Sequence, residues 1–414
     1  MVLLLGQVRE AAVQTTLPLH SPEFYAGDPY PAYRELRATS PVCWNDVNKF
    51  WALLKYEDIR FASTHPAAFT STKGITIPVP GIPNPVQQNS LIFVDPPAHR
   101  QLRTLINSGF TRRQVALLEP KIRSVVGGLL DGLTPDSVHE FVATIAAPLP
   151  IRVIAELIGA PPDDWDQFQA WTDAAIGTAD KEIDGDAMMV IGQLYHYLRQ
   201  LIAARHTEAR DDLFSVLAGA EVDGIRLTDE ELLAFSFLLL AAGNETTRNL
   251  IALGTLALIA HPDQCRLLVE DPALIPGAVE EMLRWTSPVM HMARTATAEV
   301  EIRGQRIAEG DVVVLLYGSA NRDEDVFGSD AEEFKVTRQP NPHIAFGCGE
   351  HSCVGSQLAR VTATAFFTEL LSRFPRLELI GEVNRMPATM LPLVTRMQVR
   401  LGSEATAESG GPHQ

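Results

Sequence analysis

The chain contains few cysteines and no long hydrophobic run. Four cysteines in 414 residues are too few and too scattered for a disulfide framework. The most apolar stretch, Leu232 to Asn244, stops at Glu245 and is too short to span a bilayer. The first residues, MVLLLG, lack the basic region and the apolar core of a signal peptide. These absences predict a cytoplasmic protein without a membrane anchor.

Basic residues and nucleotide-binding motifs are also scarce. The chain has 34 Lys and Arg against 51 Asp and Glu, a net charge of −17. This charge disfavours broad electrostatic attraction to nucleic acid or to an anionic membrane. No strand is followed by a Gly-x-Gly-x-x-Gly turn, so the sequence predicts neither a flavin nor a nicotinamide domain of its own.

What the chain does contain is typical of one large globular unit. Apolar residues make up 46% and charged residues 21%, with no internal repeat and no long linker. We therefore expect a single domain over residues 1–401 and a disordered polar tail over residues 402–414. The segment 71–89 holds four prolines and two glycines, which predicts a long and hence functional loop.

Helical patterns dominate the secondary structure. The clearest begins at the capping box Thr228-Asp-Glu-Glu231 and runs to His261-Pro262, a helix about 45 Å long. It is apolar nearly all round before Glu245, so it should cross the middle of the protein. A further helix is expected over 357–374. Two hairpins are expected, 42–44 with 50–54 and 300–307 with 312–316. The predicted fold class is mainly α with small β-sheets.

The segment Phe346-Gly-Cys-Gly-Glu-His-Ser-Cys-Val-Gly355 is the most informative part of the chain. Its three glycines allow unusual backbone dihedrals and a close approach of the backbone to another group. Cys353 stands just before a predicted helix, where the helix dipole and free amides should lower the pKa of its thiol.

Two other interpretations of this loop remain open at this point. Cys348, His351 and Cys353 are three possible zinc ligands, although a structural zinc site needs a fourth ligand and usually a second ligand pair. Alternatively, the loop is a glycine-rich turn that carries an inert buried cysteine.

The loop resembles the cysteine-ligand loop of the cytochrome P450 family at every fixed position, Phe-Gly-x-Gly-x-His-x-Cys-x-Gly. The resemblance extends over about residues 28–401. It implies the P450 fold, with haem b held between the long central helix and this loop. Cys353 would bind the iron, Phe346 would pack against the sulfur, and His351 would bind a haem propionate. A thiolate ligand pushes electron density onto iron and favours cleavage of the O–O bond.

Residues Ala242-Gly-Asn-Glu-Thr-Thr247 place a glycine, an acid and an alcohol in the long apolar helix. From the residues alone, such a break is structural as often as functional. In the family the helix opens here to make room for O2. The resemblance implies that Glu245 and Thr246 deliver protons during O2 reduction. A non-catalytic haem sensor, an electron carrier or a peroxide-using enzyme needs no such relay, so these classes are disfavoured.

Several cations match the positions that bind the haem propionates in the family. His99 and Arg103 lie one helical turn apart after Asp95-Pro-Pro97, a spacing that is weak evidence by itself. Together with Arg294 and His351 they would compensate the two carboxylates of haem.

A charge cluster of structural importance is also implied by the resemblance. Glu281 and Arg284 are three residues apart on one predicted helix, and Arg338 matches the third member. The pair Glu57 and Arg60 has the same spacing by chance. The family often has Asp where this chain has Lys335, which puts that local contact in question.

The substrate class is predicted from the fold analogy. The pocket should be lined by parts of segments 72–93 and 165–198, by Met390 and Leu391, and by five further residues: Ala241, Ala242, Val289, Met290 and His291. Most are apolar and methionines add adaptable surface, which favours a lipophilic substrate. Details of the motifs resemble actinobacterial members that hydroxylate sterol side chains or methyl-branched lipids. The alternative is a tailoring hydroxylase of terpenoids or polyketides.

The redox partners follow from what the chain lacks. Without a flavin or nicotinamide site, electrons from NAD(P)H must arrive through separate proteins, by resemblance a ferredoxin and a ferredoxin reductase. Such partners are usually acidic, so a local basic patch is expected despite the negative net charge. Its candidate residues are Arg100, Arg112, Arg113 and Arg360, each of which could equally be an ordinary solvated arginine.

Overall fold

The computed structural model describes residues 13–79, 90–177 and 185–403. Residues 80–89 of the predicted loop, 178–184 of the predicted pocket segment and 404–414 of the predicted tail lie outside these ranges. Gly402 ends a β-strand, so the ordered chain extends past the predicted start of the tail.

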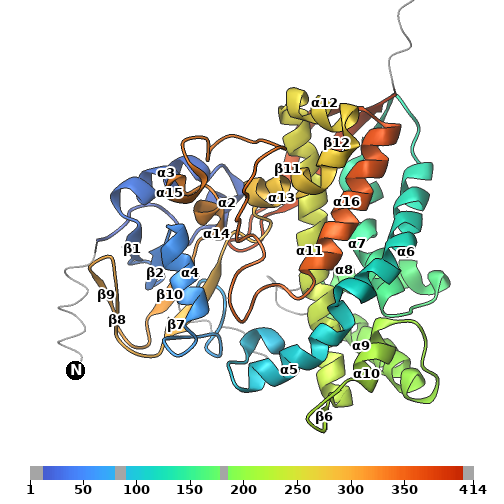
Figure 1. Cartoon of the computed structure of the whole chain (residues 1–414), viewed down its shortest axis with the longest axis horizontal. Helices are drawn as coiled ribbons and strands as arrows, with labels where there is room; N and C mark the ends of the chain where they lie inside the picture. Colours follow the sequence, from blue (N-terminus) through green and yellow to red (C-terminus); the bar gives the residue numbers. More distant parts are fainter. Residues whose placement is uncertain (1–12, 80–89, 178–184, 404–414) are drawn as a thin grey trace, which may run out of the picture.

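A five-stranded sheet lies to one side of the helices, at the left in Figure 1. Its strand order is β1 (Val42–Asn45), β2 (Phe50–Leu53), β10 (Val312–Leu315), β7 (Met292–Ala296) and β3 (Phe69–Thr70). β1 and β2 form the predicted antiparallel hairpin, with Trp44 opposite Trp51. Every residue of these two strands is buried, as expected for strands covered on both faces.

The second predicted hairpin is wrong. β8 (Val300–Ile302) pairs with β9 (Gln305–Ile307) in a sheet of its own, while β10 pairs with β2 and β7. Arg303 and Gly304 have φ values of 49° and 76°. Such a left-handed two-residue turn folds the predicted single strand 300–307 back on itself.

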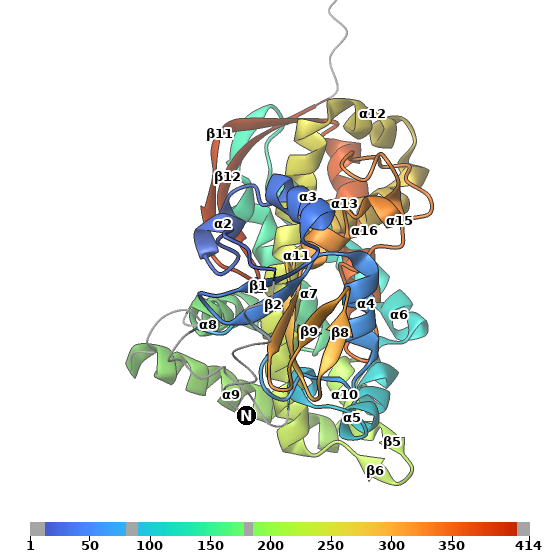
Figure 2. The same cartoon turned by 90° about the vertical axis from the view of Figure 1, so that its left-hand side faces the viewer.

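A second sheet lies at the other end of the molecule. It contains β11 (Arg376–Met386), β12 (Leu393–Gly402) and β4 (Ser137–Glu140), and β11 and β12 form a long hairpin. Figure 2 shows this hairpin beside the helices rather than beside the five-stranded sheet. A small sheet of β5 (Glu221–Val222) and β6 (Ile225–Arg226) connects two helices.

Helices form the larger part of the fold, which confirms the predicted class. The longer ones, other than the two described below, are α3 (Tyr30–Thr39), α4 (Tyr56–Thr64), α5 (Ala98–Asn107), α6 (Arg112–Asp131), α7 (Pro148–Leu157), α8 (Trp165–Gly177), α9 (Gly185–Thr207), α12 (Pro262–Glu270) and α13 (Ile275–Thr286). The short ones are α2 (Pro22–Ala26), α10 (Leu213–Gly219), α14 (Tyr317–Ala320) and α15 (Glu324–Phe327). Within the described ranges, no helix combines the length and apolarity needed to cross a membrane.

Helix α11 (Asp229–Ala260) crosses the middle of the molecule, as predicted (Figure 1). Its capping box is present: Thr228 N donates to Glu231 Oε2 at 2.8 Å, and Glu231 N donates to Thr228 Oγ1 at 3.2 Å. The helix continues through Gly243 without a break, so the expected opening at this glycine is not seen. Its leucines and isoleucines form one core with α7, α13 and α16.

Helix α16 (Ser356–Arg373) follows the Cys353 loop and agrees with the predicted helix over 357–374. It packs against α6 and α13, and its buried residues include Phe366 and Phe367. The loop that ends at Gly355 is thereby fixed at the N-terminus of a well-packed helix.

Candidate haem site

The loop from Phe346 to Gly355 is closed by backbone hydrogen bonds. Cys353 N donates to Phe346 O at 2.9 Å, and Gly347 N donates to Ile344 O at 2.9 Å. Gly349 has a φ of 74°, and a Cβ atom at this position would overlap the carbonyl oxygen of Ser63. The glycine spacing of the motif therefore has a steric cause, because only glycine can approach the backbone of α4 so closely.

Cys353 is accessible to solvent, although protein surrounds it. Burial raises the pKa of its thiol, while the N–H of Gly355 and the charges of Arg103 and Arg360 act in the opposite direction. The expectation that the helix start lowers this pKa is therefore wrong in sign, because desolvation outweighs the amides. A thiolate at this position needs a further positive partner, and a bound metal ion supplies one.

The zinc interpretation of the loop is not supported. Among the residues that the structure describes, no three His, Cys, Asp or Glu side chains are placed to hold a metal ion. Cys348 packs with the five-stranded sheet and contacts Ser63, and burial raises the pKa of its thiol.

Two histidines from distant parts of the chain meet beside the loop. The rings of His99 and His351 lie 4.3 Å apart, and His351 Nε2 lies 3.2 Å from Ser71 Oγ. His99 is completely buried, and neither of its ring nitrogens has a hydrogen-bond partner among the residues that the structure describes. Burial, followed by the charges of Arg294, His99 and Arg103, lowers the pKa of His351 to about 3. Ser71 is the first residue of the predicted functional loop 71–89, but its contact with His351 was not predicted.

Two arginines complete this cluster. Arg294 is 6% exposed, and within the described ranges its side chain donates only to the neighbouring Ala293 O, at 2.7 Å. Arg103 donates to Asn107 Oδ1 at 3.0 Å, and burial lowers its pKa. Glu350 lies 4.0 Å from His99 and is bound to Arg100, and Asp95 accepts a hydrogen bond from Ser71 N at 3.1 Å.

The cluster fits the two carboxylates of haem. Buried cations without acidic partners and a buried imidazole without hydrogen bonds are costly unless an anion joins them. The predicted propionate-binding residues therefore converge, and an accessible thiol lies close enough for Arg103 to act on it.

One face of α11 is uncovered in the middle of the molecule. Ala242 is exposed, although Leu239, Leu240 and Asn244 around it are buried. The Thr246 hydroxyl, one turn further, donates to Ala242 O at 2.6 Å. Glu245 is half-buried on the same stretch of helix. Ala242 is therefore accessible on α11 beside the two residues that were predicted to deliver protons.

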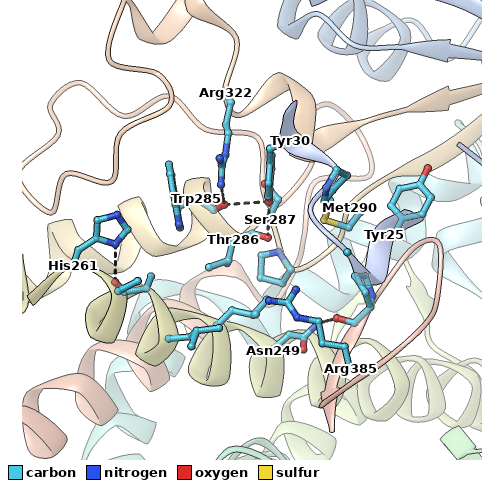
Figure 3. Close-up of a pocket in the computed structure, with 18 residues that line it drawn as sticks. Tyr25, Tyr30, Asn249, His261, Trp285, Thr286, Ser287, Met290, Arg322 and Arg385 are labelled. Atoms are coloured by element: carbon cyan, nitrogen blue, oxygen red, sulfur yellow. Dashed lines mark hydrogen bonds between the residues drawn. The ribbon is translucent and has the colours of Figure 1, made fainter. Parts of the chain in front are cut away.

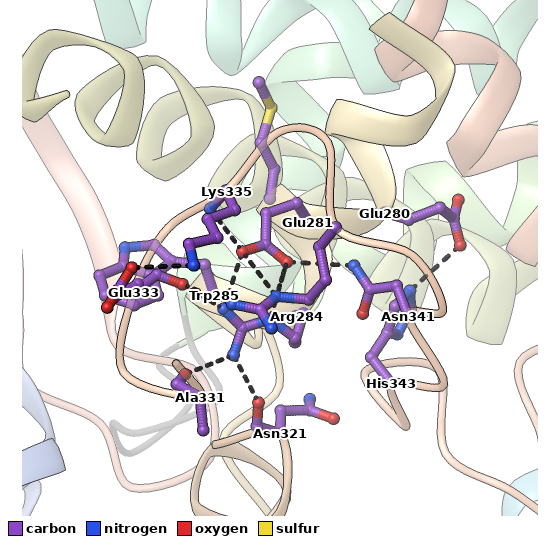
Figure 4. A network of polar contacts seen from close by, with 12 residues as sticks. Glu280, Glu281, Arg284, Trp285, Asn321, Ala331, Glu333, Lys335, Asn341 and His343 are labelled. Carbon is purple, nitrogen blue, oxygen red and sulfur yellow. Dashed lines mark hydrogen bonds and ion pairs between the residues drawn. The ribbon is translucent and has the colours of Figure 1, made fainter. Parts of the chain in front are cut away.

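The predicted Glu281 cluster is buried and fully bonded (Figure 4). Arg284 donates to both carboxylate oxygens of Glu281 at 2.7 and 2.8 Å, and Arg338 lies 3.3 Å from Glu281. Arg284 also donates to three carbonyls in segments 321–333. Lys335 contributes its backbone N–H to Glu281 at 2.8 Å, while its ammonium group binds Asp330. The departure from the family pattern at Lys335 therefore leaves the backbone contact in place.

The other predicted pocket residues lie in different surroundings. Ala241 and Val289 are half-buried, whereas Met290 is 4% exposed in the core around Tyr33. His291 is fully buried, its ring 5.5 Å from that of Tyr25. Met290 N donates to Met390 O at 2.9 Å, which joins two of the segments predicted to line the pocket.

Two arginines of the predicted basic patch are already paired. Arg100 donates twice to Glu350, at 2.9 and 2.7 Å. Arg360 donates twice to Glu280, at 2.7 and 2.8 Å, and its guanidinium lies 4.6 Å from the centroid of the Phe346 ring. Arg112 and Arg113 are exposed at the start of α6.

Comparison with known proteins agrees with this geometry. Residues 152–399 match the model of the family described as cytochrome P450. The steroid C26-monooxygenase of Mycobacterium tuberculosis is 39% identical over 88% of this chain and 91% of its own length.

The chain belongs to the cytochrome P450 family.

Other P450s share this similarity. The methyl-branched lipid omega-hydroxylase of Mycobacterium bovis is 38% identical over 83% of this chain and 84% of its own length. CYP109E1 of Bacillus megaterium, solved in complex with testosterone, is 33% identical, with a TM-score of 0.83 over 91% of this chain and 99% of that chain. The chain is thus a P450 monooxygenase, an oxidoreductase that binds haem and receives electrons from redox partners. The predicted haem-binding fold is confirmed.

Proposed function

We propose that this P450 hydroxylates a terminal methyl group of a sterol side chain or of a methyl-branched lipid. The exposed Ala242 on α11 carries the proposal, since it is an apolar, accessible position one turn from Thr246 and near Glu245. The names of the mycobacterial relatives support this substrate class. A single catalytic domain over residues 1–401 would contain the whole site.

The haem would be held by the cysteine loop and by the cluster of histidines and arginines beside it. Cys353 would ligate the iron, with Phe346 packed beside it. The carboxylates would be bound by His99, Arg103, Arg294 and His351. When bound, haem supplies the activation of O2 that inserts one oxygen atom into a C–H bond.

The protein side chains would control protons and water around this chemistry. Thr246 holds its hydroxyl proton on Ala242 O in this structure, so the hydroxyl must rotate to donate elsewhere. Glu245 is the neighbour of Thr246 in the chain and is only half-buried, so it would pass a proton from solvent to the Thr246 hydroxyl. Ala241, Ala242 and Val289 would line the substrate space, and Met290 and His291 would form the wall behind them.

Electrons would come from NAD(P)H through a ferredoxin reductase and a ferredoxin. Glu350 and Glu280 neutralise Arg100 and Arg360, so Arg112 and Arg113 are the stronger candidates for contact with an acidic partner. Exchanging both for Glu should raise the KM for the ferredoxin without changing substrate binding.

A tailoring role on polyketides is the second candidate. The P450 PksS of the Bacillus subtilis bacillaene polyketide synthase is 33% identical, with a TM-score of 0.83 over 94% of this chain and 100% of that chain. Its lower identity than that of the lipid hydroxylases makes it the weaker analogy.

A matched ligand panel separates the two. The haem spin-state band is followed with a sterol that carries its full alkyl side chain, the same ring system without it, a methyl-branched fatty alcohol and a macrolactone. We expect the full sterol or the branched alcohol to shift the band and to be oxidised at a terminal methyl. A shift with the macrolactone alone would contradict the lipid proposal, as would binding of the sterol or branched alcohol without a hydroxylated product.

A further inference from the structure

A second cavity, of about 260 Å³, lies away from the predicted catalytic groups. It is bounded by the C-terminal half of α11, the end of α13 and the β11–β12 hairpin (Figure 3). Neither Cys353 nor Glu245 nor Thr246 lines it.

The wall on the α11 side is apolar and incompletely covered. Leu253 and Leu256 are half-buried, whereas Gly254, Thr255 and Ala257 between and beside them are buried. Both leucines line the cavity. Apolar side chains left open on a helix that is otherwise packed favour an apolar occupant over water.

Arg322 is a cation of this cavity whose charge is already compensated. Its guanidinium lies 3.4 Å from the ring centroid of Tyr30 and 3.6 Å from that of Trp285. It also binds Glu332 at 3.1 Å and donates to Trp285 O at 3.1 Å. Arg322 therefore forms part of the wall.

Arg385 is different. Its side chain forms no hydrogen bond and no ion pair with any residue that the structure describes, although its charge acts on Tyr30. No Asp or Glu of the described ranges lines the cavity. The β11–β12 ladder is irregular at Asn384 and Arg385, and such bulges redirect side chains. In Figure 3 the Arg385 side chain extends from the hairpin over α11, beside Asn249.

We propose that this cavity binds a small lipophilic carboxylate, with the carboxylate on Arg385 and the alkyl chain along Leu253 and Leu256. A guanidinium can bind a carboxylate through two parallel hydrogen bonds. The volume has room for roughly nine water-sized groups, which corresponds to an acid of about octanoate size. The cavity shares Met290 with the proposed wall of the substrate space, but none of the predicted catalytic groups lines it. The proposal does not depend on the identity of the oxidised substrate.

The test uses the haem-loaded protein with an azole inhibitor on the iron, so that the substrate space is blocked. Titration calorimetry with octanoate should then show one bound acid per chain, and 1-octanol should bind about tenfold more weakly. Arg385→Gln should weaken octanoate binding by about tenfold or more. Arg396→Gln is the matched control, because Arg396 is an exposed arginine on the same hairpin without a partner in the described chain. It should bind octanoate like the wild type.

A second variant tests the cavity without changing the charge of the protein. Leu256→Trp should fill the cavity and abolish octanoate binding, while the haem spectrum stays unchanged. The proposal is overturned if octanoate fails to bind once the azole is present, or if Arg385→Gln binds as tightly as Arg396→Gln. The first result would show that the cavity takes no such acid, and the second that Arg385 does not hold the carboxylate.

Discussion

The rings of His99 and His351 lie 4.3 Å apart although one comes from α5 and the other from the cysteine loop. Arg103 and Arg294 act electrostatically on the same His351 ring. Two arginines and two histidines thus converge beside an accessible thiol, and two acids of the described chain, Glu350 and Asp95, act on His99. This arrangement fits haem, whose two carboxylates would lie at the arginines and histidines and whose iron would bind the thiolate.

Replacement of Thr246 should separate electron use from product formation. In Thr246→Ala the hydroxyl that now donates to Ala242 O is lost, so reduced oxygen should leave as peroxide. We expect product per NAD(P)H to fall several-fold and peroxide to rise. Thr246→Ser should restore most of the coupling. Thr247→Val, at the buried neighbouring position, is the control. Equal coupling in Thr246→Ala and the wild type would refute the assigned role.

The Glu281 cluster should contribute strongly to stability. Glu281→Ala leaves Arg284 completely buried without its carboxylate, which should cost about 3–5 kcal/mol in the free energy of unfolding. Glu57→Ala removes an exposed pair of identical spacing, Glu57 and Arg60, and should cost less than about 1 kcal/mol. Urea unfolding of the two variants measures the difference. Similar losses would show that burial of the cluster is unimportant.

Substitution of Gly349 should disturb the cysteine loop. In Gly349→Ala the added Cβ meets the Ser63 carbonyl and the residue keeps a left-handed φ, so we expect a loss of about 3 kcal/mol and weaker haem retention. Gly304→Ala shares the left-handed φ but has open space around it, and should cost only about 1–2 kcal/mol. Haem transfer to apomyoglobin and urea unfolding report the two effects. Equal behaviour of the variants would contradict the steric account.

His291 should make stability fall in mild acid. Burial lowers the pKa of this fully buried ring from 6.5 to about 3, although the backbone of Thr389 opposes the shift. Below pH 6.5 the unfolded chain therefore takes up a proton that the folded chain does not. Stability from this group is complete above pH 6.5 and is lost progressively towards pH 3. Between pH 7 and pH 5 this amounts to about 2 kcal/mol.

Urea unfolding at these two pH values measures the effect. His291→Gln should lose about 2 kcal/mol less than the wild type, whereas His196→Gln, at an exposed site, should follow the wild type. Parallel pH dependence of His291→Gln and the wild type would show that the ring is not held neutral.

Local signals in the sequence predicted the parts of the fold that depend on near neighbours. The capping box at Thr228, the β1–β2 hairpin and α16 lie where their residues indicated. The strand pairing of β10 could not be predicted in this way, because its partners are β2 and β7, far away in the sequence. Arg303-Gly304 could have been recognised as a turn, but the apolar pattern over residues 300–307 resembled a single strand.

In the site, too, some features follow from local sequence and others depend on segments far apart in the chain. The glycine positions and Cys353 follow from the motif, since backbone geometry requires them. Which acids neutralise Arg100 and Arg360, and whether the Cys353 thiol is desolvated, depend on the packing of distant segments. These features had no local signal, and they changed the expected charge of the surface near the cysteine.

The carbon-monoxide spectrum of the reduced protein tests the central assignment most directly. The wild type and Cys348→Ser should give the long-wavelength Soret band of thiolate-ligated haem, and Cys353→Ser should lose it. A short-wavelength band in the wild type, or a band that survives in Cys353→Ser, would contradict Cys353 as the axial ligand.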